Sequence, residues 1–185
     1  MLNHYSIVIH PQDPIIELFN SLKSKLLTKI GTYGSCHSTA HITILEYEAT
    51  EEESKFIIEK LEKITFTEIP FDALFDQVIY SDSSKAIFVL PNKSGNVFFK
   101  KLFSKIRKQI KGDSNKSGAH LTIGRKLNHE QLKKSKDIFN DIKFDFHCNQ
   151  IAVRRLNKDI GQFEVVKIFP FSGKPDTTEQ LSFGF

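Results

Sequence analysis

The most constraining feature of this chain is the tripeptide His-x-Thr, which occurs twice in similar apolar surroundings. The copies read Ala40-His41-Ile42-Thr43-Ile44 and Ala119-His120-Leu121-Thr122-Ile123. Alternate side chains of a β-strand point to the same face, so each copy predicts a strand that presents an imidazole and a hydroxyl side by side. A single match could arise by chance in 185 residues, whereas two matches with like flanks indicate a repeated unit.

The segments before the two motifs correspond as well. Ile7-Val8-Ile9-His10-Pro11 resembles Ile87-Phe88-Val89-Leu90-Pro91, which lies 80 positions later, and the two motif histidines are 79 positions apart. The helical stretches that follow each proline align at the same offset, with Leu18, Phe19, Leu22, Ser24, Lys25, Leu26 and Ile30 falling on Phe98, Phe99, Leu102, Ser104, Lys105, Ile106 and Ile110. We therefore expect an internal duplication with half-units of roughly 5–80 and 85–171, followed by a tail over 172–185.

Each half-unit has the same predicted order of elements. An apolar strand ends at a proline, an amphipathic helix and a polar loop follow, and the His-x-Thr strand comes next. A second helix then begins at Thr50-Glu51-Glu52-Glu53, which has capping-box spacing, and at Asn128 in the second half. Interleaved Phe, Ile and Val predict further strands over Phe66 to Tyr80, Phe144 to Leu156 and Gln162 to Phe171.

This order predicts an α+β protein with a bilobal, pseudo-two-fold arrangement. Two antiparallel sheets face a central cleft, and the helices pack on their outer faces. A repeat of about 80 residues is too long for a solenoid, so we expect one two-lobed domain across residues 1–185. If the halves are related by an approximate two-fold axis, the two His-x-Thr motifs line opposite walls of the cleft.

Composition sets the remaining limits. The chain is 39% apolar, with 17 Phe and no Trp, so phenylalanine should fill much of the core. We see no secretory signal and no apolar run near the roughly 20 residues that span a bilayer, which predicts a cytoplasmic protein with no membrane contact, most simply a monomer. Cys36 and Cys148 are too few for a disulfide framework. The formal charge of +4 suits an anionic ligand.

The paired motifs predict acid–base chemistry on a phosphodiester. An imidazole titrates near neutral pH, so His41 and His120 can serve as general base and general acid in one displacement. Thr43 and Thr122 can donate hydrogen bonds to the non-bridging phosphate oxygens. Arg125, five residues after His120, can offer a guanidinium fork to the same phosphate. No Walker-type loop, nucleophile elbow or dinucleotide fingerprint competes with this interpretation.

Two His-x-Thr strands one half-unit apart resemble the 2H phosphoesterase superfamily, in particular its 2'-5' RNA ligase-like and cyclic phosphodiesterase branch. The resemblance covers roughly residues 3–171, and an Arg shortly after the second motif, here Arg125, is also typical of it. It implies catalysis without metal or cofactor on nucleotides or RNA with a 2',3'-cyclic phosphate or a 2'-5' linkage, including reversible ligation. The chain departs from the bacterial ligases at Glu46-Tyr47-Glu48, where they are typically apolar with a Gly.

Four alternatives remain open at this level. Cys36, His37 and His41, with His120, could form a zinc site. The cleft could belong to a non-catalytic nucleotide- or RNA-binding module, or to a carbohydrate isomerase with paired acid–base groups. The lysine-rich stretches are either solvated outer faces or an electrostatic funnel for nucleic acid, and they comprise Lys100, Lys101, Lys105, Arg107, Lys108 and Lys111, then Lys133, Lys134 and Lys136.

Overall fold

The computed structural model describes residues 1–113, 117–136 and 138–174 of the chain. Its elements run β1 Asn3–Ile9, α1 Asp13–Ile30, β2 Ile42–Ala49, α2 Glu51–Thr67, β3 Phe71–Ser81, β4 Ala86–Pro91, α3 Lys93–Gln109, β5 Leu121–Arg125, α4 His129–Ser135, β6 Phe144–Cys148, β7 Gln150–Asn157 and β8 Gln162–Pro170. Strand, helix, strand, helix and strand thus occur twice in succession, as predicted, and β7 and β8 follow. Within the described residues, no helix is both long enough and apolar enough to cross a membrane.

The strands form two four-stranded sheets in which every neighbouring pair is antiparallel. The first sheet has the order β2-β1-β7-β8 and the second has the order β5-β4-β3-β6. The predicted α+β class with two antiparallel sheets is therefore confirmed. The third strand of the first repeat, β3, joins the sheet of the second repeat, whereas β7 and β8 complete the first sheet.

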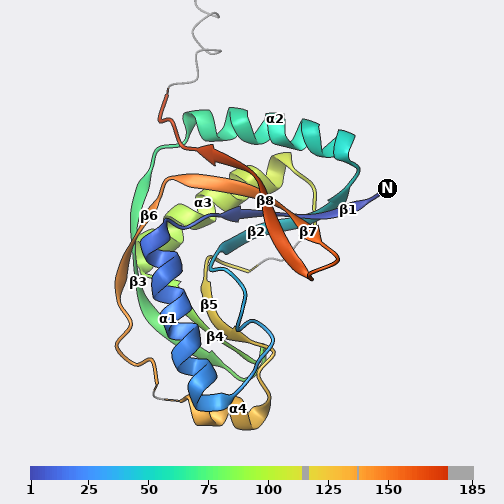
Figure 1. Cartoon of the computed structure of the whole chain (residues 1–185). Helices are drawn as coiled ribbons and strands as arrows, with labels where there is room; N and C mark the ends of the chain where they lie inside the picture. The colour runs from blue at the N-terminus through green and yellow to red at the C-terminus, as the bar shows by residue number, and fades with distance from the viewer. Residues whose placement is uncertain (114–116, 137, 175–185) are drawn as a thin grey trace, which may run out of the picture.

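The helices lie outside the two sheets (Figure 1). Helix α2 runs along the outer side of the first sheet beside β8, while α1 and α4 pack together at the opposite end of the molecule beside β5. Both predicted helix starts are confirmed, and each has a capping box, from Thr50 to Glu53 at the start of α2 and from Asn128 to Gln131 at the start of α4. Phenylalanines fill the core as expected, with the Phe75 ring stacked on Phe144 at a centroid distance of 5.3 Å.

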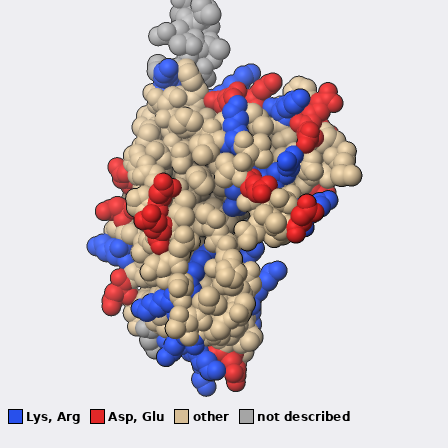
Figure 2. Space-filling view, in the orientation of Figure 1, with Lys and Arg blue, Asp and Glu red and all other residues tan. Residues whose placement is uncertain are grey.

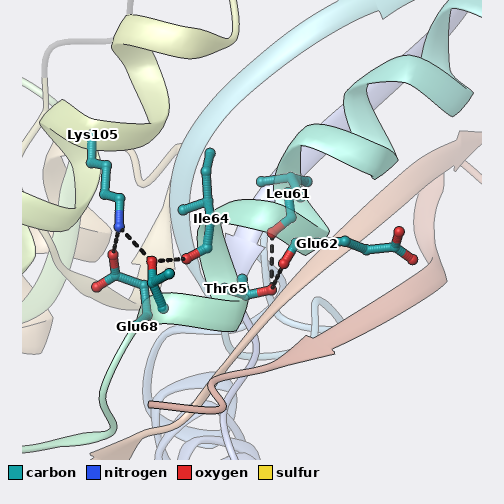
Figure 3. A network of polar contacts seen from close by, with 7 residues as sticks. Leu61, Glu62, Ile64, Thr65, Glu68 and Lys105 are labelled. Atoms are coloured by element: carbon teal, nitrogen blue, oxygen red, sulfur yellow. Dashed lines mark hydrogen bonds and ion pairs between the residues drawn. The ribbon is translucent and has the colours of Figure 1, made fainter. Parts of the chain in front are cut away.

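Two predicted strand boundaries are wrong. The strand expected from Phe66 begins at Phe71, because α2 continues to Thr67 and its last turn is tied to α3. Figure 3 shows the Nζ of Lys105 reaching Glu68. The same Nζ donates to the hydroxyl of Thr67 at 3.1 Å. The stretch Phe144 to Leu156 is two strands that join different sheets, β6 and β7, separated at Asn149. The predicted tail is described only to residue 174, and its remainder lies outside the described residues.

Each sheet carries a β-bulge at the same place in the repeat. The register shifts between Ile7 and Val8 where β1 pairs with β2, and between Ile87 and Phe88 where β4 pairs with β5. The extra residue on the bulged strand is Ile44 in the first repeat and Ile123 in the second. A bulge reverses the alternation of faces, and this reversal decides which side chains reach the cleft.

The carbonyl of each bulge residue is bonded by a side chain from the other repeat. Arg107 of α3 donates from Nε and Nη2 to the Ile44 oxygen at 2.9 and 2.7 Å. The hydroxyl of Tyr33, in the loop after α1, donates to the Ile123 oxygen at 3.3 Å. Because an unpaired buried carbonyl is costly, these two bonds stabilise both bulges and hold the repeats against each other.

Candidate active site

One cleft brings the two motifs together. It has a volume of about 510 Å³ and lies between the strands that follow the motif histidines. All five residues singled out from the sequence line it, namely His41, Thr43, His120, Thr122 and Arg125. Each histidine lies one position before its strand rather than within it, since β2 begins at Ile42 and β5 at Leu121.

The two imidazoles are held in the same way. The Nδ1 of His41 lies 2.7 Å from the Thr39 carbonyl oxygen, and the Nδ1 of His120 lies 2.9 Å from the Gly118 carbonyl oxygen. A carbonyl only accepts, so each Nδ1 carries the proton and donates it. The Nε2 atoms have no hydrogen-bond partner among the described residues. In each ring, Nε2 is therefore the nitrogen available to a ligand in the cleft.

The surroundings of His41 favour its neutral form. Burial is the largest cause, and the positive charge of Arg154 is the next, with smaller contributions from Lys23 and Arg125. Together they lower the pKa of His41 to about 3, although the bond to the Thr39 carbonyl opposes the shift. With Nδ1 protonated and the ring neutral, Nε2 of His41 presents a lone pair to the cleft.

Lys23 positions the loop that leads to His41. This lysine of α1 is only 3% exposed, and its Nζ donates to the carbonyl and hydroxyl oxygens of Ser38, the latter at 2.8 Å. Burial, followed by the charge of Arg125, lowers the pKa of Lys23 to about 8. The same loop reaches the second repeat, where the backbone N–H of Arg125 donates to the Ser35 hydroxyl at 3.0 Å.

Arg125 and Glu46 occupy equivalent positions on opposite walls. Each follows the threonine of its motif by three residues, a spacing that would place it on the other face of a regular strand. The bulges at Ile44 and Ile123 restore the alignment, so both side chains line the cleft. One wall is therefore basic where the other is acidic. The Oε2 of Glu46 lies 3.0 Å from Nε2 of His4.

Arg154 is a residue beside the cleft that the sequence did not single out, and it lines an adjoining pocket together with His41 and Thr43. It lies on β7 and is 6% exposed, and its Nε has no hydrogen-bond partner among the described residues. Its guanidinium carbon lies 5.2 Å from the centre of the Phe163 ring. Burial lowers the pKa of Arg154 to about 10, which leaves the guanidinium charged at neutral pH.

The lysine-rich helices do not line the cleft. Lys100, Lys101 and Lys108 are exposed on the outer side of α3, and Arg107 is engaged with the backbone. Figure 2 shows Lys and Arg gathered at the end of the molecule around α4 and mixed with acidic residues over α2. The zinc alternative is not supported either: within the described residues, no three His, Cys, Asp or Glu side chains are grouped so that they could hold a metal ion.

No protein-family model and no curated protein matches the sequence. Solved structures do match the fold. LigT from E. coli, in complex with phosphate, has a TM-score of 0.67 at 13% identity, covering 92% of this chain and 98% of LigT. TT0787 from Thermus thermophilus has a TM-score of 0.67 at 16% identity, covering 93% of this chain and 100% of that protein.

A further structure, described as a phosphoesterase, has a TM-score of 0.60 at 11% identity and covers 93% of this chain and 99% of its own. These likenesses extend over nearly the whole length of both partners. At such low identity they show the fold, which is the one that the resemblance to 2H phosphoesterases implies.

Proposed function

We propose that this protein is a phosphoesterase of the 2H type, which hydrolyses a 2',3'-cyclic phosphate or a 2'-5' linkage of a nucleotide or RNA without a metal ion. The observation that carries the proposal is the equivalent fixing of two imidazoles in one cleft, each bonded through Nδ1 to the carbonyl two residues before it. A structural histidine needs no such partner in the second repeat, whereas an in-line displacement needs one group on each side of phosphorus.

The bound ligands of a structural neighbour support the same class of substrate. LigT from E. coli has been solved in complex with phosphate and with 3'-AMP. A cleft of about 510 Å³ lined by Arg125 and two threonine hydroxyls suits a phosphate group with a nucleoside attached.

In the proposed mechanism, His41 is the general base and His120 is the general acid. The neutral His41 takes a proton from water at Nε2 as the water oxygen attacks phosphorus. An anionic phosphate bound in the cleft beside Arg125 offsets the positive charge that Arg154, Lys23 and Arg125 exert on His41 and raises the pKa of His41, which makes it a better base during the reaction.

His120, protonated on both nitrogens, donates its Nε2 proton to the ribose oxygen as the P–O bond breaks. Water is consumed, and the cyclic diester becomes a phosphomonoester with one free ribose hydroxyl. Thr43, Thr122 and Arg125 bind the non-bridging oxygens, where negative charge increases in the transition state. With a ribose 5'-hydroxyl in place of water as the attacking nucleophile, the same step would open the cyclic phosphate to a 2'-5' linkage and free the 3'-hydroxyl, and the reverse of that step would cleave the linkage.

The test is turnover of the four nucleoside 2',3'-cyclic phosphates in EDTA by the wild type, His41→Ala, His120→Ala and a control, His147→Ala. His147 is exposed on β6, bonded to Asp72, and lies outside the cleft. We expect turnover in the wild type and control and a loss in both motif variants. Nucleotide binding without turnover by the wild type would instead indicate the non-catalytic binding module.

A further inference from the structure

A second pocket continues the cleft on the side of the first sheet. It has a volume of about 370 Å³ and lies between the loop after α1 and the hairpin that joins β7 to β8. We call it the hairpin pocket and define it by Glu46, Arg154, Ile160 and Phe163. His41 and Thr43 line both this pocket and the main cleft, so a group attached to a phosphate in the cleft can extend into it.

Arg154 lines this pocket and has an unused hydrogen-bond donor. The residue is only 6% exposed, with Nη2 3.3 Å from the Ser6 hydroxyl and Nε unpartnered among the described residues. A buried guanidinium N–H without an acceptor is costly, so its presence in a pocket points to an acceptor on a ligand.

Glu46 supplies acceptors in the same row of the sheet. Ser6 of β1 pairs with Glu46 on one side and with Arg154 on the other, so all three side chains share a face. Adjacent strands lie about 4.8 Å apart, so the backbones of Glu46 and Arg154 lie roughly 10 Å apart, with the small Ser6 between them. His4 approaches only the Oε2 of Glu46, at 3.0 Å.

Apolar surface completes the hairpin pocket. Phe163 is half-buried, and its ring is fixed between His4, at a centroid distance of 5.3 Å, and Arg154. Ile160, at the tip of the hairpin, is 59% exposed. A planar ring with polar edges fits such a site, since its face contacts Phe163 or Ile160 while its edge meets Glu46 and Arg154.

We propose that the hairpin pocket binds the base of the substrate and selects guanine. Guanine presents two adjacent donors, N1–H and N2–H, to a carboxylate, and next to them the O6 and N7 acceptors that a guanidinium prefers. Adenine has neither the paired donors nor O6, and uracil has one ring N–H. This inference rests on the proposed function only in assuming that the ligand is a nucleotide.

The first test is the kcat/KM for guanosine and adenosine 2',3'-cyclic phosphates in the wild type, Glu46→Gln and Glu48→Gln. Glu48 is exposed two positions further along β2 and does not line the pocket, which makes it a matched control. We expect a guanosine preference of roughly tenfold or more, the size of one good bidentate contact to a base. Glu46→Gln should abolish the preference by lowering kcat/KM for guanosine far more than for adenosine, and Glu48→Gln should retain it.

The second test measures binding without turnover, using guanosine and adenosine 2'-monophosphates and calorimetry. Tighter binding of the guanosine compound that is lost in Glu46→Gln supports the base pocket even if no cyclic nucleotide is hydrolysed. Equal turnover and equal binding of both nucleotides would overturn the pocket and leave the phosphoesterase proposal intact. No binding of either nucleotide would overturn it as well.

Discussion

The two His-x-Thr walls of the cleft share a backbone arrangement and differ in the groups around it. His41 and His120 make the same bond to the carbonyl two residues before them, and a bulge follows each motif threonine. Around this frame, the first wall carries Glu46 where the second carries Arg125. This repeated backbone arrangement therefore fixes the geometry of both imidazoles, and only the neighbouring side chains can make the two act differently.

Those neighbours act electrostatically on His41. Burial and Arg154, Lys23 and Arg125 lower the pKa of His41. His120 instead lies beside the Phe88 ring, with the ring centroids 5.2 Å apart. Val8 is the residue equivalent to Phe88 in the first repeat, so among the described residues His41 has no matching aromatic contact from that position. The two imidazoles are therefore held in the same geometry but have different neighbours. Such a difference can make one imidazole a base and the other an acid without moving either ring.

The largest effect should come from the histidines themselves. His41→Gln and His120→Gln should each lower kcat/KM for a cyclic nucleotide by about 10²- to 10⁴-fold, the contribution of one general acid or base. Bis(p-nitrophenyl) phosphate separates the roles, because its phenolate leaves without a proton. With this ester, His120→Gln should keep most of the wild-type rate, and His41→Gln should still be impaired. The reverse pattern would exchange the two roles, and equal losses would remove the asymmetry.

The next effect concerns the position where the walls differ most. Replacing Arg125 by Met removes the proposed charged donor to the phosphate and should lower kcat/KM by roughly ten- to a hundredfold. Arg125→Lys keeps the charge but not the fork, so it should recover part of that loss. Lys126→Met, which removes a charge one position away without lining the cleft, is the matched control. If Lys126→Met is as impaired as Arg125→Met, general surface charge rather than a phosphate contact is responsible.

A smaller and nearly equal effect is expected for the two threonines. Thr43→Val and Thr122→Val retain the shape of the side chain and delete one neutral donor each, so each should reduce kcat by about two- to tenfold. Steady-state kinetics on a cyclic nucleotide would measure both, with Thr28→Val on α1 as a control outside the cleft. A large loss on one wall only would mean that the phosphate is not shared between them.

The two sheets and the cleft between them could be predicted because repetition and periodicity can be read directly from the sequence. The offset between Pro11 and Pro91, and the alternation within each motif, were enough to predict both sheets and a cleft containing both histidines. The end of α2 and the break at Asn149 could not be predicted in this way. Both depend on tertiary contacts, such as the bond from Lys105 to Thr67, and on the exchange of strands between sheets.

Arg154 is the part of the site that could not be predicted from the sequence. It stands beside Arg155 in β7, and nothing in the pair indicates which guanidinium points inward. In the structure, Arg155 is exposed and bonded to Glu51 at 2.9 Å, whereas Arg154 is buried against Ser6 and Phe163. The pairing of β7 with β1 determines which arginine points inward. Because the paired residues are about 150 positions apart, the residues around Arg154 in the sequence do not reveal this orientation.

The smallest expected effect on the difference between the walls is a shift in the pH dependence of the reaction when Arg154 is replaced. With bis(p-nitrophenyl) phosphate only the general base should matter, so kcat/KM should fall as the pH falls through the pKa of His41 in the free enzyme. The lowered pKa places this fall below the ordinary histidine value of 6.5. Arg154→Met removes a positive neighbour, raises the pKa of His41 and should move the fall to higher pH, whereas Arg154→Lys should move it less. At pH 7 the rate should change little, because His41 is neutral in each case. A profile that Arg154→Met leaves in place, or moves to lower pH, would show that Arg154 does not act on the base.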